Sequence, residues 1–256
     1  ACAPLQTQPG ITPPPAEVRF ESAECMFGDL NGVDCGYLYV PEDRSQSDSP
    51  EIKLAVAIIR STNPTEAPDP VLLLVSWLGG AGSQFVEFTE GLMVAVKGIR
   101  DNRDVIVFDQ RGAGYSSTFL ECDEVANQVI QDAPQNLSEA ESERHRFQAY
   151  RACYDRLSQT GINLSAYTNA ANAADANDLR MALGYTEWNI VADTYSTRLA
   201  LTIMRDFPDG VRSAVLDSPY PLQANLDTEA AANAERALHL LFERCAVDNT
   251  CNTAYP

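Results

Sequence analysis

Residues 188–201 read Trp-Asn-Ile-Val-Ala-Asp-Thr-Tyr-Ser-Thr-Arg-Leu-Ala-Leu. The first part of this stretch is an apolar run of the length of a buried strand. The last part has the apolar spacing of an amphipathic helix. Only a few residues separate the two, so the stretch predicts a strand, a tight turn and a helix in direct succession.

This layout is that of a nucleophile elbow, whose consensus is G-x-S-x-G. The five positions hold Ala192, Asp193, Thr194, Tyr195 and Ser196. Threonine therefore stands in the serine position, and larger residues replace both glycines. Because the central residue needs a positive φ, a β-branched side chain there costs on the order of 1–3 kcal/mol. The three departures predict either relaxed selection for a sharp elbow or a turn that has opened.

Strand and helix patterns alternate on both sides of this stretch. Such alternation predicts an α/β fold with a mainly parallel sheet and helices on both faces. Residues 19–60 form the exception, since their alternating patterns predict antiparallel strands at a sheet edge, and residues 123–160 are polar and largely helical. The expected strands are 36–40, 53–59, 71–76, 104–109, 188–193 and 211–217, and the expected helices lie near 85–98, 138–157, 170–183, after the turn to about 206, and 224–245.

Composition limits the classes of function. The chain has 256 residues, of which 45% are hydrophobic, and a formal net charge of −18. Such a negative charge repels phosphate backbones, so nucleic acid is not an expected partner. The longest apolar stretch, Val71 to Leu78, has the length of a buried strand rather than of a membrane span.

Seven cysteines are many for a cytosolic protein. No C-x-x-C pair occurs, and neither of the two histidines stands at metal-ligand spacing, so no metal site is expected. We therefore predict disulfides and an exported protein, although six cysteines allow fifteen connectivities. The short-range pairs are Cys25 with Cys35, Cys122 with Cys153, and Cys245 with Cys251.

Cys2 has no partner in that scheme and precedes a Pro/Gln-rich stretch. Residues 1–18 read as a flexible tether. A lipid-modified Cys2 on this tether would attach the protein to a membrane. The alternative is a free thiol or a terminal remnant in a disordered tail.

Two loops follow the expected buried strands. Leu78-Gly-Gly-Ala-Gly82 would let a substrate oxygen approach backbone N–H groups closely, or would serve as a plain strand-to-helix turn. Asp109-Gln-Arg-Gly-Ala-Gly-Tyr-Ser116 predicts a structural turn held by an Asp/Arg pair.

With these motifs the chain resembles α/β-hydrolases of the proline iminopeptidase and secreted tripeptidyl aminopeptidase group. That group carries G-G-P-G, D-Q-R-G-x-G-x-S and G-x-S-Y-G-T-R-L-A in the same order. Cys35 to Arg44 and Val215 to Pro219 also resemble its strands, so the resemblance runs from about residue 23 to the end. With the tether read from composition at 1–18, the resemblance implies a hydrolase core at 19–221 and the start of a helical cap or lid at 222–256.

The resemblance also assigns roles at the elbow. Thr194 takes the nucleophile position, and the backbone N–H groups of Tyr195 and of Gly79 and Gly80 take the oxyanion hole. In the family the catalytic acid and histidine follow the cap. Either they lie beyond residue 256, in a C-terminal half or a second chain, or no triad forms. His145 and His239 are expected to be ordinary helix residues.

Two functions remain open. The first is a secreted hydrolase of peptide or small acyl substrates, aminopeptidase-like or esterase-like, that uses the Thr194 hydroxyl. The second is a catalytically silent pseudohydrolase that acts as an exported binding or scaffold protein. No cofactor is expected for either.

Overall fold

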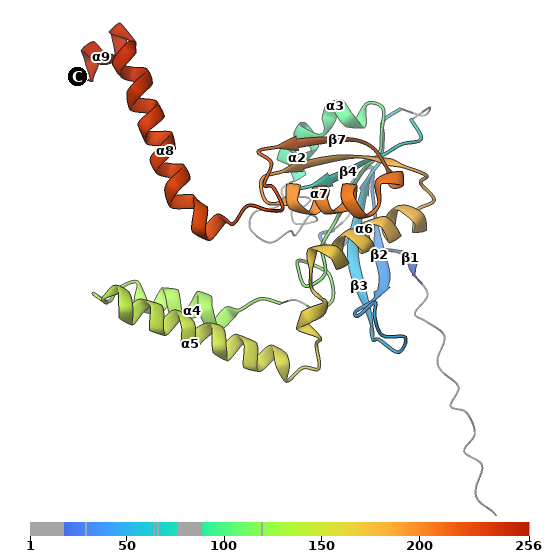
Figure 1. Ribbon diagram of the computed structural model, residues 1–256. Coiled ribbons are helices and arrows are strands. Elements are labelled where there is room, and N and C mark those ends of the chain that lie inside the picture. The colour runs from blue at the N-terminus through green and yellow to red at the C-terminus, as the bar shows by residue number, and fades with distance from the viewer. Residues whose placement is uncertain are drawn as a thin grey trace, which may run out of the picture. The chain divides into compact units, whose positions relative to one another are not determined.

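The computed structural model describes residues 18–28, 30–63, 65, 67–75, 89–118 and 120–255 (Figure 1). The tether with Cys2, the glycine loop with Gly79 and Gly80, and the beginning of the helix expected at 85–98 lie outside the described residues. The chain divides into two compact units, Ala1–Pro219 and Tyr220–Pro256, and each is described by itself.

A seven-stranded sheet forms the first unit, in the order β1-β2-β3-β5-β4-β6-β7. The first three strands and β5 pair antiparallel, whereas β4 pairs parallel with both β5 and β6, and β7 pairs parallel with β6. The α/β fold, with antiparallel strands at one edge and parallel strands beyond them, is confirmed. The strands are β1 Arg19–Ala23, β2 Val33–Pro41, β3 Glu51–Ile59, β4 Val71–Leu74, β5 Val105–Phe108, β6 Trp188–Asp193 and β7 Val211–Asp217.

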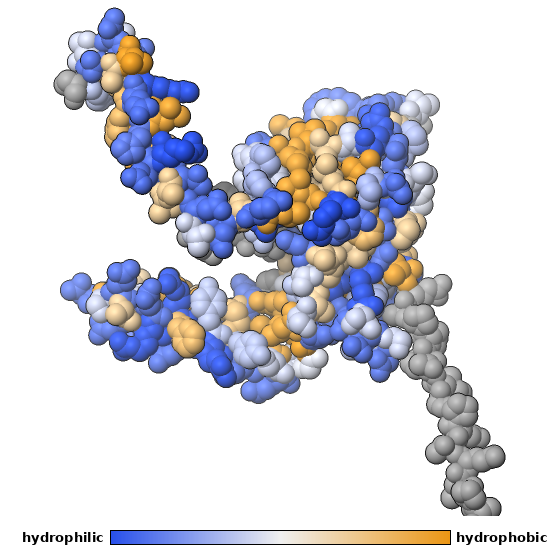
Figure 2. Space-filling view, viewed as in Figure 1, coloured by the Kyte–Doolittle hydropathy of each residue, from blue (hydrophilic) through white to orange (hydrophobic). Residues whose placement is uncertain are grey.

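Burial agrees with this strand order. All residues of β4 and β5 are buried, as expected for apolar runs in the middle of a sheet covered on both faces. β7 is the last strand of the described sheet, and its residues are exposed or half-buried, with Val215 62% exposed. Figure 2 shows apolar surface on this part of the first unit.

Helices lie on both faces of the sheet. On one face α6 (Asn169–Ala182) and α7 (Ser196–Asp206) bury apolar residues such as Leu179, Leu199 and Ile203 against the strands. On the other face Leu92 of α2 (Thr89–Ala95) and Val96 pack with β4 and β5. Gly184 follows α6 with a φ of +81°, the conformation in which helices commonly end at a glycine.

The helix expected at 85–98 is not continuous over its described part. The structure has α2 and then α3 (Lys97–Arg100), separated by Val96. Val96 leaves the helical region, with a ψ of 0°, while its side chain stays buried in the core. The expected helix is therefore two short helices, with a buried residue between them.

An α-helical hairpin joins β5 to α6. It consists of α4 (Asp123–Asp132) and α5 (Glu139–Ser158). Ser138 begins α5 with a capping box, in which its side chain and that of Glu141 bond each other's backbone N–H groups. A 3₁₀ turn η1 (Leu164–Ala166) leads from the hairpin to α6, and a second one, η2 (Pro208–Gly210), joins α7 to β7.

All three expected disulfides are present, so the short-range pairing is confirmed. Cys25–Cys35 joins the start of β2 to the segment after β1, and Cys122–Cys153 joins the base of α4 to α5. Their Cα–Cα distances are 5.0 and 5.3 Å, within the ordinary range for a disulfide. Each bond closes a local segment rather than joining distant parts of the chain.

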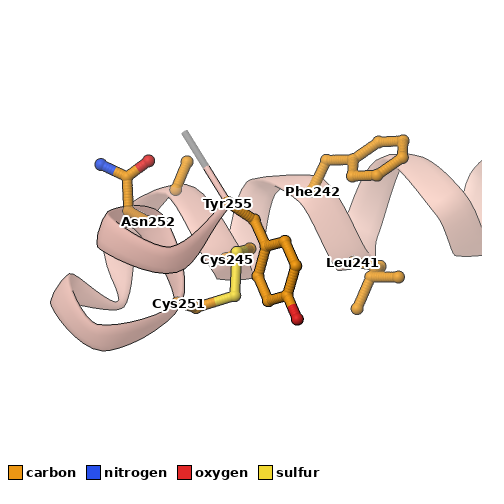
Figure 3. Close-up of a pocket in the computed structure, with 7 residues that line it drawn as sticks. Leu241, Phe242, Cys245, Cys251, Asn252 and Tyr255 are labelled. Atoms are coloured by element: carbon orange, nitrogen blue, oxygen red, sulfur yellow. A yellow bond between two sulfur atoms is a disulfide. The ribbon is translucent and has the colours of Figure 1, made fainter.

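The second unit consists of α8 (Leu226–Val247) and α9 (Asn249–Ala254). The Cys245–Cys251 disulfide joins the two helices, and Asp248 caps α9 with its side chain. Figure 3 shows Leu241, Phe242 and Tyr255 around an apolar hollow beside this disulfide. Among the described helices, none has both the length and the apolar character needed to cross a bilayer.

Candidate functional site

The turn between β6 and α7 has the backbone of a sharp elbow. Thr194 has a φ of +43°, in the left-handed region that β-branched residues rarely adopt. Its side chain is exposed, as is that of Tyr195, which is 42% exposed at the first turn of α7. The turn has therefore not opened. It keeps the strained conformation although neither Ala192 nor Ser196 is a glycine.

Hydrogen bonds on both sides of Thr194 hold this conformation. Its N–H donates to the Asp217 carbonyl of β7 at 3.0 Å. Its carbonyl accepts from the Thr197 N–H at 3.2 Å and from the Thr197 hydroxyl at 2.6 Å. The neighbouring strand and the first turn of the helix thus fix the peptide groups on either side of the hydroxyl.

The two positions at which the elbow consensus has glycine are buried. Ala192 and Ser196 are each 1% exposed. Among the described residues, no group forms a hydrogen bond with the Ser196 hydroxyl or with Oδ1 of Asp193. Ser196 is therefore shielded from solvent, and among the described residues its hydroxyl carries the cost of a buried polar atom without a partner.

A second carboxylate lies next to the elbow. Asp193 and Asp217 are paired positions at the ends of β6 and β7. Ser218 follows with a φ of +54° and donates a hydrogen bond to the Asp217 carboxylate at 3.0 Å. The sequence predicts the Val215–Pro219 segment only as a strand. The position of Asp217 beside Asp193 follows from the register of β6 and β7, which local sequence patterns do not give.

The Asp109 turn is structural, but the expected Asp/Arg pair needs a correction. The Asp109 carboxylate accepts from the Tyr115 N–H at 2.6 Å, and the Ser116 hydroxyl donates to the Asp109 carbonyl at 2.8 Å. A side chain at Gly114 would overlap the Asp109 carboxylate, which explains the glycine. The carboxylate that pairs with Arg111 comes from α6, a partner too distant in sequence to predict.

Arg111 forms a buried ion pair with Asp175. Its Nε and Nη2 donate to the two carboxylate oxygens at 2.7 and 2.8 Å, and both side chains are fully buried. Nη1 donates to the carbonyls of Glu42 and Ala166 at 2.6 and 2.9 Å. This one guanidinium therefore joins the end of β2, η1 and α6.

A second arginine completes this cluster. Arg44 contacts both Asp175 and Asp178. Burial raises the pKa of the Asp178 carboxyl above its ordinary value, although the charge of Arg44 opposes that shift. These contacts join the segment after β2 to α6, and we assign them a structural role.

Both histidines lie on helices, each beside a carboxylate. Nδ1 of His145 is 2.9 Å from Oδ1 of Asp132 on the neighbouring helix, and His239 is 3.8 Å from Glu235 on its own helix. Within the described residues, no group of three or more His, Cys, Asp or Glu side chains could hold a metal ion.

Comparisons with known proteins identify the family of the fold. A family model described as the alpha/beta hydrolase fold matches residues 69–243. The chain is 27% identical over 234 residues to the serine protease Hip1 of Mycobacterium tuberculosis, an alignment that covers 88% of this chain and 43% of that protein. It is 28% identical over 228 residues to the tripeptidyl aminopeptidase of Streptomyces lividans, with 84% and 42% covered.

A solved structure, that of a proline iminopeptidase-related protein from Thermus thermophilus, matches with a TM-score of 0.41 and 18% identity, and the match covers 79% of this chain and 45% of that one. The chain thus spans less than half the length of the curated relatives it matches.

Proposed function

Because the chain belongs to the alpha/beta hydrolase fold family, we propose that it is the nucleophile-bearing part of an exported acyl hydrolase. In this proposal the Thr194 hydroxyl attacks a peptide or ester carbonyl. The observation that carries it is the conformation of Thr194, which is exposed at a strand–helix turn with a φ of +43°. A strained backbone that is retained despite a β-branched residue is typical of a functional position.

The attack needs stabilisation of the oxyanion that forms on the substrate. The backbone N–H of Tyr195, at the positive end of α7, supplies one donor, and those of Gly79 and Gly80 supply the other. Asp193 and Asp217 lie close by, and their negative charge opposes an oxyanion. The carbonyl oxygen would therefore face the helix end rather than the ends of the two strands.

A base and an orienting acid are also required. The proposal assigns both to polypeptide beyond residue 256, either a C-terminal half or a second chain. Two exposed apolar surfaces support further polypeptide: the β7 edge with Val215, and Leu241 and Phe242 of α8, which are 60 and 64% exposed. The coverage of less than half of the curated relatives supports it as well.

The names of the relatives suggest the substrate class. One is a serine protease and another a tripeptidyl aminopeptidase, so we propose peptides with a free amino terminus, or small acyl esters, as substrates. Three disulfides support a location outside the cytoplasm. A lipid on Cys2 is our proposal for attachment to a membrane.

Labelling with a fluorophosphonate tests the nucleophile. The full-length protein is treated with the reagent, and the site is located by intact mass and peptide mapping. We expect one label per molecule, on Thr194, and none in Thr194→Ala. Thr118→Ala is the matched control, because Thr118 is a second threonine with positive φ, +67°, on another segment, and its loss leaves labelling unchanged. A folded protein without label contradicts the proposal.

The second candidate is a pseudohydrolase that binds a ligand without turnover. The buried Ser196 hydroxyl, which has no partner among the described residues, favours it, because an efficient elbow keeps a small residue at that position. In this case the wild-type protein stays unlabelled while folded. A Thr194→Ser variant that gains label would then show that the oxyanion hole and the base remain and that only the hydroxyl has been altered.

A further inference from the structure

The α4–α5 hairpin contains a hollow that the chemistry of the elbow does not use. Its volume is about 320 Å³, at the lower end of the roughly 300–1,000 Å³ of small-molecule sites. Side chains from both helices and from the turn between them line it. The ones that carry the argument are Gln128, Val129, Asp132, Leu137, Ser142 and Arg146.

Arg146 is the cation of this hollow. Nine other arginines of the described chain form ion pairs, in a protein with a net charge of −18. Within the same described part, the guanidinium of Arg146 forms neither an ion pair nor a hydrogen bond. An unpaired guanidinium beside the Ser142 hydroxyl, one helical turn away, is suited to a carboxylate.

Asp132 is the anion of the hollow. Its Oδ1 accepts a hydrogen bond from Nε2 of Gln128 and contacts Nδ1 of His145, both at 2.9 Å. These contacts, above all the one with His145, lower the pKa of the Asp132 carboxyl, so it is ionised at neutral pH. As far as the described residues go, Oδ2 has no hydrogen-bond partner, which leaves it for a donor from a ligand.

Apolar side chains line the hollow together with the two charged groups. They include Val125, Val129 and Leu137. We propose that this hollow binds a small apolar α-amino acid as its zwitterion, with the carboxylate on Arg146, the ammonium group on Asp132 and the side chain against the valines and the leucine. The opposite charges of ligand and lining select this class over simple anions or cations.

Titration of the ¹⁵N-labelled protein with leucine, followed by NMR, tests the site. We expect saturable shifts confined to α4 and α5, with a Kd on the order of 1 mM because the charged contacts are partly exposed. N-acetyl-leucine lacks the ammonium group and leucine amide lacks the carboxylate, so each should bind about tenfold more weakly or not at all.

Two variants locate the contact. Arg146→Gln should weaken leucine binding about tenfold or more, whereas Arg144→Gln, a change of an exposed arginine on the same helix outside the hollow, should leave it unchanged. Absence of saturable shifts with leucine, equal binding of all three ligands, or equal loss in both variants would overturn the proposal.

The site does not depend on the proposed hydrolase activity. Thr194→Ala should bind leucine like the wild type, because Thr194 is not part of the hollow. If the protein binds leucine but is not labelled by the fluorophosphonate, the proposed function is contradicted and this site is supported. If it is labelled but does not bind leucine, the proposed function is supported and this site is contradicted.

Discussion

Thr194 shows how a single residue can hold a costly conformation. Its φ of +43° costs about 1–3 kcal/mol for a β-branched side chain, and the hydrogen bonds to Asp217 and Thr197 compensate for this cost. Ser196, two positions later, has no such compensation. Its hydroxyl is buried without a partner in the described chain, so part of the stability of the protein is lost there.

Two serines of similar burial should therefore respond in opposite ways to the same change. Ser196→Ala removes a hydroxyl that no described group bonds, and it should raise the free energy of unfolding by about 1 kcal/mol. Ser116→Ala should lower it by about 1–3 kcal/mol, because the Ser116 hydroxyl donates to the Asp109 carbonyl and accepts from the Ala55 N–H. Urea denaturation measures both. Equal destabilisation by the two changes would show that the Ser196 hydroxyl has a partner.

At the scale of elements, the α4–α5 hairpin is held by its own contacts. The Cys122–Cys153 disulfide closes its base, and Arg156 donates from Nε to Glu124 at 2.6 Å near the same end. His145 and Asp132 join the helices nearer the turn. These links make the hairpin a firm support for the hollow that lies between its helices.

The Glu124–Arg156 pair makes the hairpin sensitive to acid. Hydrogen bonds from Arg156 lower the pKa of Glu124 from its ordinary 4.5 to about 2. A lowered pKa means that the pair stabilises the fold above pH 4.5, and that this contribution disappears as the pH falls towards 2.

In Glu124→Gln, the stability of the hairpin should therefore fall less between pH 4.5 and 2 than in the wild type. Hydrogen exchange of amides in the hairpin measures this difference. Glu143→Gln removes an exposed carboxyl that forms no ion pair with a described residue, and it should leave the profile unchanged. A profile that is identical for wild type and Glu124→Gln would contradict the role of the pair.

At the scale of the whole molecule, the Arg111–Asp175 pair joins segments that are far apart in sequence. It connects the end of β2, the turn η1 and α6, and so holds the entry and the exit of the hairpin on the sheet. Both side chains are fully buried, so each depends on the other for its charge to be tolerated.

Asp175→Asn should lower the free energy of unfolding by about 3–5 kcal/mol, because it leaves the Arg111 guanidinium buried without a full counter-charge. The control is Asp101→Asn, which removes an exposed carboxylate 3.5 Å from Lys97 and should change stability by less than about 1 kcal/mol. Thermal and urea unfolding measure both. A loss as small as in the control would mean that the cluster tolerates an unpaired guanidinium.

Most elements could be predicted from local patterns. The fully buried β4 and β5, the antiparallel edge, the disulfide pairs and the strand–turn–helix at Thr194 all follow from residues close together in sequence. The break at Val96 and the pairing of Arg111 with Asp175 could not be predicted, because both depend on contacts across the folded chain.

The sequence by itself determined the α/β architecture and the position of the elbow, because hydrophobic periodicity and turn residues act over a few neighbouring positions. It also indicated that Thr194 replaces serine. Only the tertiary structure decided that the turn remains sharp, because the Asp217 carbonyl that accepts the Thr194 N–H belongs to a separate strand. Likewise, the burial of Ser196 and the meeting of Asp132 with Arg146 around one hollow exist only after two elements have packed together.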